Sequence, residues 1–208
     1  MQRMIVMLAI MALSSSPPFA SEPLPPFAKY TCEGFYFRAL VPSTWMRSDR
    51  NPPYADITRV AGAKFEGTPN GEDVPASISL YWYSGERSFT TPDSYINARL
   101  GSMAREDAER GRATFDAQVA GRKATGFKMK TFELVMLPHD RLKPGKDDGP
   151  IVYELAPPSR KVIMDDQYIV LPVSKGYFVL HYRAPESIVE ANRPIFDKVI
   201  ASFEPLVP

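Results

Sequence analysis

Hydrophobic and polar residues alternate most clearly near the C-terminus of the chain, in two short segments that follow one another. Residues 168–173 and 177–183 are rich in β-branched and aromatic residues, and Ser174-Lys175-Gly176 separates them. Alternation is typical of β-strands, and a glycine in a short connection favours a hairpin turn. Because both alternate faces of 177–183 are largely apolar, we expect a central strand that is covered on both sides.

An amphipathic helix is predicted directly after this strand pair. Its apolar residues recur at helical spacing and are Ile195, Phe196, Val199, Ile200 and Phe203. They form a single stripe that has to lie against a sheet. Since Pro194 lacks a backbone donor, we expect the regular helix to begin near it, with any helical turn before it kinked.

A second helix is predicted near the middle of the chain, over residues 91–110. Thr91 supplies a capping hydroxyl, Pro92 suits the first helical position, and Asp93 places a carboxylate near the positive end of the helix dipole. Gly111 then ends the helix. Its apolar stripe consists of Ile96, Leu100, Met103 and Ala104. We expect this helix to cover a sheet and to keep its charged side in water.

Strand patterns fill most of the remaining chain. They cover residues 34–41, 56–65, 76–83, 114–119, 125–136 and 151–155. The turn-rich residues 67–71 connect the second and third of these strands, which indicates a hairpin. Each predicted helix has one apolar stripe and needs a sheet to cover it. We therefore predict an α+β fold with a single antiparallel β-sheet flanked by helices.

Two adjacent carboxylates, Asp165 and Asp166, stand just before the C-terminal strand pair. A general acid/base pair needs both groups at one centre, whereas neighbouring side chains of a strand point to opposite faces. We therefore interpret Asp165-Asp166 as a bulge or turn, and residues 161–166 as a lead into the strand 168–173.

The first twenty residues have the three parts of a secretory signal peptide. Arg3 supplies the positive charge, residues 4–13 form an apolar run, and a small-residue exit follows up to Ala20. The run is too short to span a bilayer. We predict cleavage after Ala20 and a periplasmic or secreted protein, in which residues 21–28 are a proline-rich tether and residues 29–208 form a single globular domain.

Charge and cysteine content narrow the function. The chain has 25 basic and 24 acidic residues in a mixed order, and loss of the signal peptide removes only Arg3, so the mature chain is formally neutral. Such a charge balance does not point to nucleic acid or to an anionic membrane surface. The single cysteine, Cys32, excludes an intramolecular disulfide. We interpret Cys32 as a small buried residue, with an intermolecular or reactive thiol as the alternative.

Candidate binding residues lie on one strand and in one loop. Tyr81 and Tyr83 share a face of the strand 76–83 and form a candidate recognition surface, with ordinary sheet packing as the alternative. Residues 137–150 have no secondary-structure pattern, and long loops in compact domains are often functional. The candidate binding residues of this loop are His139, Asp140, Arg141, Asp147 and Asp148.

The same loop holds the candidate metal ligands of the chain. His139, Asp140, Asp147 and Asp148 lie within ten residues and carry donor types that divalent ions accept. Adjacent residues do not point at one centre without a special backbone, so a solvated polar loop is the favoured interpretation. We predict no metal site and no cofactor.

The order of several short motifs resembles the PsbP-like group, which has the Mog1/PsbP-like α/β/α sandwich. The motifs are Val41-Pro42-Ser43-Thr44-Trp45 at the end of a strand, Gly121-Arg122-Lys123-Ala124 in a turn, Tyr177-Phe178-Val179-Leu180-His181-Tyr182 in a strand, and Ser202-Phe203 at the end of the final helix. With the mid-chain helix they span residues 35–203. The resemblance implies a bacterial secreted protein that binds a protein partner, and this group has no shared catalytic residues to carry over.

Two hypotheses about function remain. The first is a non-enzymatic accessory or protein-interaction domain with an unknown partner. The second is a hydrolase or metal-dependent enzyme that uses His139 or His181 with carboxylates from distant segments. The sequence contains no nucleotide-binding glycine loop, zinc-protease motif or nucleophile elbow, which favours the first hypothesis. A concave site in which a histidine and a carboxylate converge would support the second.

Overall fold

The computed structural model describes residues 23–48, 59–68, 74–84, 91–101, 113–136 and 159–207. In chain order the elements are β1 Phe27–Thr31, β2 Phe37–Pro42, β3 Met46–Ser48, β4 Arg59–Glu66, β5 Ser77–Ser84, α1 Pro92–Gly101, β6 Ala113–Val119, β7 Arg122–Met136, β8 Ser159–Val173, β9 Gly176–Pro185, α3 Val189–Ser202 and β10 Glu204–Pro205. Within these residues, no helix has both the length and the apolar character that a membrane span requires.

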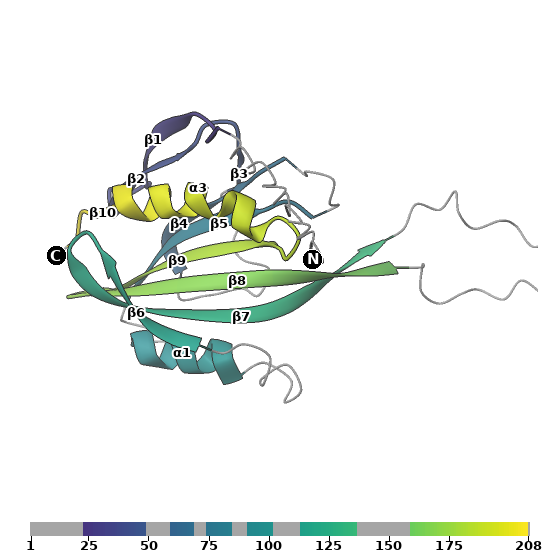
Figure 1. Cartoon of the computed structure of the whole chain (residues 1–208). Helices are drawn as coiled ribbons and strands as arrows, with labels where there is room; N and C mark the ends of the chain where they lie inside the picture. The colour runs from purple at the N-terminus through teal and green to yellow at the C-terminus, as the bar shows by residue number, and fades with distance from the viewer. Residues whose placement is uncertain are drawn as a thin grey trace, which may run out of the picture.

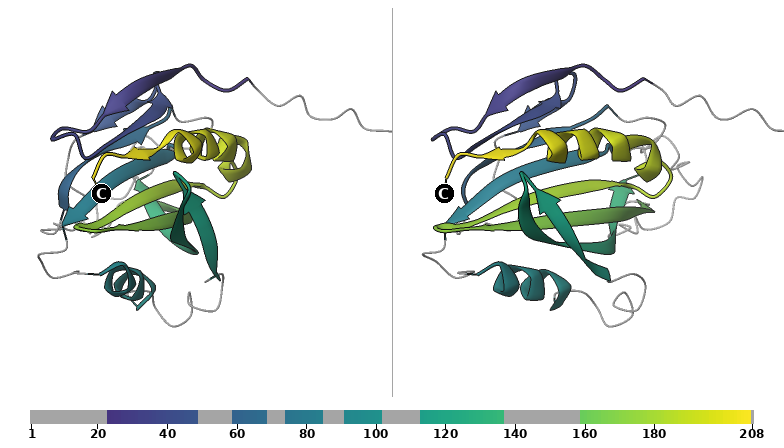
Figure 2. Two further views of the ribbon diagram at one scale, coloured as in Figure 1. Left: turned by 90° about the vertical axis from the view of Figure 1, so that its left-hand side faces the viewer. Right: turned by 60° about the vertical axis from the view of Figure 1, so that its left-hand side comes forward.

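The main sheet has seven antiparallel strands in the order β3-β4-β5-β9-β8-β7-β6. Helix α1 lies against one face of this sheet and α3 against the other, so the sheet is the middle layer (Figure 1). Figure 2 shows the same layers from two other directions. The predicted α+β class, with an antiparallel sheet between helices, is confirmed.

A second sheet lies beside α3, and the sequence did not predict it. Its strands follow the order β1-β2-β10, and its apolar residues share one core with α3 and the main sheet (Figure 1). The prediction of a single sheet is therefore wrong. β1 begins at Phe27, inside the segment predicted as a tether, and β10 has only two residues. Segments this short show no alternation from which a strand can be predicted.

Strand β9 lies between β5 and β8, as its two apolar faces predict. Phe178 and Leu180 belong to the core beneath α3, whereas Tyr177 and Val179 belong to the core beneath α1. His181 continues the second series and lies on the α1 face. The central position of β9 brings residues of β5 and β8 to either side of this histidine.

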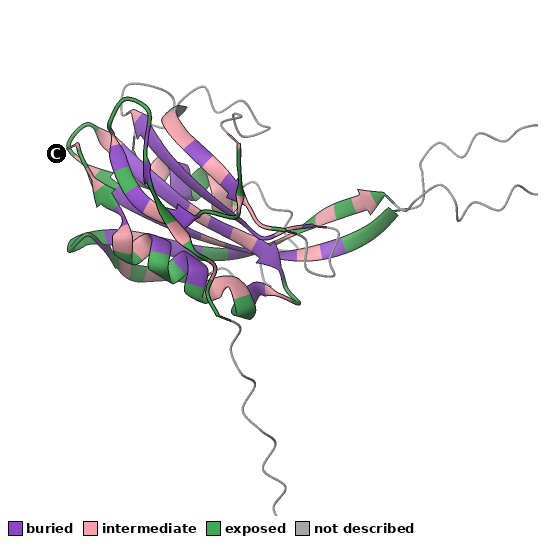
Figure 3. Ribbon diagram, turned by 90° about the horizontal axis from the view of Figure 1, so that it is seen from above, coloured by how far each residue is buried: buried purple, intermediate pink, exposed green. Residues whose placement is uncertain are grey.

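Strands β7 and β8 have 15 residues each and project beyond the rest of the main sheet as a two-stranded ribbon (Figures 1 and 3). The pairing of β8 with β9 ends at Met164, whereas its pairing with β7 continues to Ser159, opposite Met136. Asp165 and Asp166 lie within this regular strand. The interpretation of these aspartates as a bulge or turn is therefore wrong, because pairing on both edges keeps the backbone extended there.

The other predicted elements are found near their expected positions. β4 and β5 form the predicted antiparallel hairpin. Within it, Gly62 lies so close to β5 that a Cβ atom would be 2.2 Å from the Leu80 carbonyl oxygen, and this excludes any larger residue. The backbone N–H of Ser94 donates to Thr91 Oγ1 at 3.2 Å, which confirms the predicted helix cap. The predicted continuation of this helix after Gly101 and the predicted strand 151–155 lie outside the described residues.

Helix α3 begins at Val189 and includes Pro194, so the prediction that it starts near the proline is wrong. Side chains hold the turn that precedes Pro194 in place. Tyr182 Oη donates to the Val189 carbonyl oxygen at 2.8 Å, and Asn192 Nδ2 donates to the Ile188 carbonyl oxygen at 3.1 Å. These bonds stabilise the first turn without the backbone donor that proline lacks. The predicted apolar stripe of the helix packs against the core.

Candidate functional site

A cluster of polar side chains surrounds Asp166 on the α1 face of the main sheet. This aspartate lies in β8, between β7 and β9, and is 3% exposed. Thr131 Oγ1 on β7 donates a hydrogen bond to Asp166 Oδ2 at 2.5 Å. His181 Nε2 on β9 lies 2.7 Å from Asp166 Oδ1. Three adjacent strands therefore bring their polar groups together at one buried carboxylate.

Two kinds of contact hold the imidazole of His181: a hydrogen bond at a ring nitrogen and aromatic stacking on the ring face. Its ring stacks on Tyr168 with centroids 3.9 Å apart and an angle of 3° between the planes, and Tyr168 stacks in turn on Phe127. Burial lowers the pKa of His181, although the hydrogen bond with Asp166 opposes this shift. The orientation of this histidine is therefore fixed by packing and by one strong acceptor.

Arg183 and Glu133 extend the cluster toward the ribbon. Arg183 Nη2 lies 3.1 Å from Glu133 Oε2, and Arg183 Nε lies 3.8 Å from Asp166 Oδ1. The buried Nε atom makes no hydrogen bond to any described residue. Charged networks of this kind hold strands in register when their members are bonded to one another. The imidazole of His181 can take up or release a proton, which is the property of this cluster that is relevant to catalysis.

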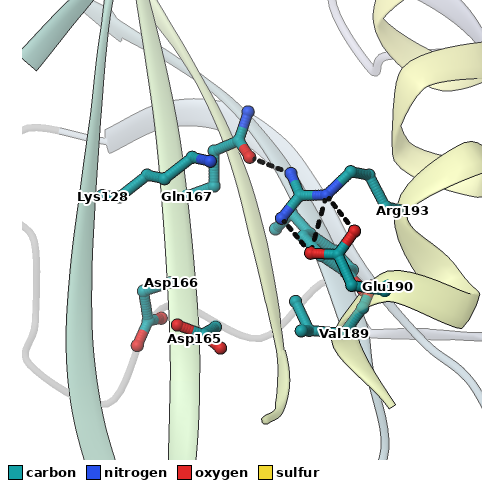
Figure 4. Close-up of a pocket in the computed structure, with 8 residues that line it drawn as sticks. Lys128, Asp165, Asp166, Gln167, Val189, Glu190 and Arg193 are labelled. Carbon is teal, nitrogen blue, oxygen red and sulfur yellow. Dashed lines mark hydrogen bonds and ion pairs between the residues drawn. The ribbon is translucent and has the colours of Figure 1, made fainter. Parts of the chain in front are cut away.

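A pocket of about 170 Å³ lies on the opposite face of the sheet, between the strands β7 and β8 and the first turns of α3 (Figure 4). Its lining residues are Lys128, Asp165, Asp166, Gln167, Tyr182, Val189, Glu190 and Arg193. Asp165 lines the pocket, whereas the carboxylate of Asp166 is bonded to Thr131 and His181 on the α1 face. The two adjacent aspartates therefore serve different faces of the sheet and do not form an acid/base pair.

Charged groups of both signs line this pocket. Arg193 Nε lies 3.2 Å from Glu190 Oε2, and Arg193 Nη1 donates to Gln167 Oε1 at 2.5 Å (Figure 4). Asp165 Oδ1 lies 4.0 Å from Lys130 Nζ. Burial raises the pKa of Asp165, and the charge of Lys130 opposes this shift. The pocket is thus suited to a small polar ligand rather than to an apolar one.

Three large apolar side chains are exposed on one face of the ribbon. Phe132, Leu134 and Met136, which we call the apolar stripe, alternate along β7 and have exposed fractions of 48%, 60% and 70%. Figure 3 shows exposed and intermediate residues alternating along the projecting part of the ribbon. Lys161 Nζ on β8 lies 4.2 Å from the centroid of the Phe132 ring. The ribbon therefore presents apolar surface with positive charge beside it.

The candidate residues predicted from the sequence lie in three different places: in the core, in the Asp166 cluster, and outside the described residues. Tyr81 and Tyr83 are buried beneath α1, where Tyr83 stacks on Tyr177 with centroids 5.1 Å apart. Their interpretation as a recognition surface is wrong, because α1 covers that face of β5. The loop candidates His139, Asp140, Arg141, Asp147 and Asp148 lie outside the described residues. His181 belongs to the Asp166 cluster.

Cys32 is buried in the core formed by α3 and both sheets, as predicted. Burial raises the pKa of its thiol to about 11. The thiol therefore stays protonated at neutral pH, and a protonated thiol is a poor nucleophile. This finding favours the packing role over the alternative of a reactive thiol.

The pairing of His181 with Asp166, the pocket and the apolar stripe were not predicted from the sequence. The stripe had a sequence signal, since Phe132, Leu134 and Met136 alternate inside a predicted strand. The pairing and the pocket had no sequence signal, because their residues are distant in sequence and meet only through strand register and helix packing.

Among the described residues, no group of three or more histidine, cysteine, aspartate or glutamate side chains is placed to hold a metal ion.

Comparisons with known proteins give structural likenesses only. The sequence matches no protein-family model and no curated protein. One similar solved structure is the cyanobacterial PsbP (CyanoP) of Synechocystis sp. PCC 6803, with a TM-score of 0.46 and 10% identity over 89% of this chain and 96% of that one. By its name, that solved structure belongs to the group whose motifs the sequence resembles. No residue role passes from these proteins to this chain.

Two further solved structures are similar. LpqN of Mycobacterium tuberculosis, which is involved in cell envelope biogenesis, gives a TM-score of 0.41 and 13% identity over 83% of both chains. A protein from Bacteroides thetaiotaomicron gives a TM-score of 0.40 and 13% identity over 85% of this chain. This chain spans 47% of the length of that protein.

Proposed function

We propose that the chain is a non-enzymatic accessory domain, periplasmic or secreted after removal of its signal peptide, which binds a protein partner through the β7–β8 ribbon. The observation that carries this proposal is the apolar stripe formed by Phe132, Leu134 and Met136. Monomeric proteins seldom expose several large apolar side chains side by side, and such groups are typical of protein-binding sites.

The composition of the stripe suits a protein interface. Phenylalanine and methionine are enriched at interface centres, where their large side chains anchor a partner. Lys161, which lies over the Phe132 ring, supplies a positively charged rim. A fitting partner therefore presents an apolar groove with acidic residues at its edge.

The predicted binding loop follows the ribbon strand β7 directly in the chain. The loop candidates lie in the chain between Met136 and Ser159, which are paired with each other at the far end of the ribbon. His139, Asp140, Arg141, Asp147 and Asp148 remain a predicted second part of the binding surface. Their polar character complements the apolar stripe, as a polar rim complements an interface centre.

A capture experiment tests the ribbon. The triple variant Phe132→Ser, Leu134→Ser, Met136→Ser removes the apolar stripe, and we expect it to lose at least about tenfold in partner capture from envelope extract, because interface anchors are each worth about 1 kcal/mol or more. The matched control replaces three exposed apolar residues elsewhere, Leu24, Met46 and Leu206, with serine. This control should capture the partner as the unchanged protein does.

Both variants should keep nearly the same melting temperature, since exposed side chains contribute little to folding. Equal capture by the ribbon variant and the unchanged protein would contradict the proposal. The hydrogen-bonded pair of His181 and Asp166 is the observation that favours the alternative, a hydrolase. If the protein shows turnover and this turnover disappears in a folded His181→Ala variant, the hydrolase hypothesis holds and the proposal of a non-enzymatic binding domain is wrong.

A further inference from the structure

The pocket between β7, β8 and α3 contains two opposite charges that no other described residue pairs closely. Among the described residues, the Lys128 ammonium forms no ion pair within 4.0 Å; it lies 6.0 Å from the Phe115 ring centroid, and its charge acts on Glu190 only as a minor influence on the pKa of that carboxyl group. The Asp165 carboxylate has Lys130 only at 4.0 Å. That lysine is already bonded to Glu186.

The other charged groups of the pocket are paired with each other. Arg193 bonds to both Glu190 and Gln167, so these three side chains form a closed wall on the side of α3 (Figure 4). Lys128 and Asp165 are therefore the lining groups that have no close ion pair within the pocket and can bind a charged ligand. One is a cation on β7 and the other an anion on β8.

The strand register places these two groups within reach of one small molecule. Lys128 pairs with Gln167 and Lys130 pairs with Asp165, so Lys128 and Asp165 are diagonal neighbours on adjacent strands. The backbones of diagonal neighbours of this kind lie about 7–8 Å apart, so one small ligand can contact both side chains.

We propose that this pocket binds the zwitterionic head of a free α-amino acid, with the ligand carboxylate at Lys128 and the ligand ammonium at Asp165. A simple carboxylate would leave Asp165 unpaired, and a simple amine would leave Lys128 unpaired. A charged group in a partly enclosed site is stabilised by a direct partner of opposite charge. Only a ligand with both charges supplies both partners.

The size of the pocket agrees with such a ligand. Its volume of about 170 Å³ is well above the roughly 10–15 Å³ that one water molecule needs, so it has room for a small organic ligand. Val189 and Glu190, the first two residues of α3, line the pocket, and the Ile188 cap position makes no side-chain hydrogen bond. The partial positive charge of the helix start adds to the attraction for the ligand carboxylate.

Titration of the purified protein with L-alanine, followed by amide NMR shifts, tests this proposal. We expect saturable shifts at Gln167, Val189 and Glu190. Propionate and ethylamine are the two halves of alanine, and we expect each to bind at least about tenfold more weakly, since each forms only one charged contact. The same loss is expected for alanine binding to the Lys128→Gln and Asp165→Asn variants.

Matched controls are Lys123→Gln on β7 and Asp116→Asn on β6, which remove the same charges from exposed positions outside the pocket lining. These controls should bind alanine as the unchanged protein does. The proposal is overturned if alanine causes no saturable shift, if propionate alone binds as tightly as alanine, or if both pocket variants keep full affinity. This inference goes beyond the proposed partner binding and does not depend on the ribbon.

Discussion

Asp166 shows how tertiary structure changes the chemistry of a single residue. In the sequence it is one of two adjacent aspartates, and its neighbour Asp165 is chemically identical. In the structure Asp166 is buried and bonded to Thr131 and His181, whereas Asp165 lines a pocket on the other face of the sheet. Truncation of one member of a buried polar network leaves its partners unsatisfied, so Asp166 is the more critical of the two for folding.

The lowered pKa of His181 predicts a pH dependence of stability. Burial disfavours the charged imidazole, so the unfolded chain takes up this proton at a higher pH than the folded chain does. The stabilising contribution is fully present above the ordinary pKa of about 6.5 and is lost as the pH falls below it. Unfolding in denaturant at about pH 7.5 and about pH 5.5 should therefore show a smaller loss of stability on acidification in His181→Gln than in the unchanged protein.

The comparison of the two proteins is the control, because all carboxylates titrate in both. Glutamine keeps an N–H donor for Asp166 and removes both the titration and the stacking on Tyr168, and the loss of stacking affects stability at both pH values alike. An identical pH dependence in both proteins would show that His181 takes up its proton equally in the folded and unfolded states.

At the scale of elements, helix α3 connects the two sheets. Its stripe packs on the main sheet, and Phe203, directly after its last turn, stacks on Phe37 of the smaller sheet with centroids 5.2 Å apart. Phe203 also contacts Phe178 of β9. The sequence predicted the stripe but not the smaller sheet, because a stripe shows only that a helix must be covered.

Replacement of Phe203 with alanine should lower the free energy of unfolding by about 3–5 kcal/mol, the usual cost of a buried phenylalanine. Denaturant melts measure this change. The matched control is Phe132→Ala on the exposed part of the ribbon, which should cost less than about 1 kcal/mol. A similar small change at Phe203 would mean that α3 does not depend on this aromatic contact.

At the scale of the whole molecule, the main sheet separates two regions with different chemistry. The α1 face carries an aromatic core and the Asp166 cluster, and the α3 face carries the larger core and the charged pocket. The ribbon continues β7 and β8 beyond the end of the main sheet (Figure 1). A partner bound at the ribbon and a small ligand bound in the pocket would both contact β7 and β8, so these two strands link the two proposed sites.

Export is the prediction that concerns the whole chain. Residues from Met1 to Ala20 should be absent from the exported protein, because their charge, apolar run and exit match a cleaved signal peptide. Intact-mass analysis of the protein from the cell envelope or medium measures this directly. The variant Leu8→Lys breaks the apolar run and should stay inside the cell at full mass. An exported protein that retains Met1 would contradict the predicted cleavage.

The sequence alone determined the features that depend on local pattern. Alternation and helical periodicity gave the α+β class, the central position of β9, the β4–β5 hairpin and the cap of α1 at Thr91. These features follow from the residues of one segment and their burial. The composition also gave a correct expectation for Cys32, since a lone cysteine is most often a small buried residue.

The tertiary structure decided everything that depends on which segments meet. Strand register brought Asp166 to His181, and the packing of α3 brought Arg193 to Gln167. Coverage by α1 turned Tyr81 from a candidate surface residue into a core residue. These outcomes arise from contacts between residues distant in the chain, and neither alternation nor spacing in the sequence records which face of a strand another element will cover.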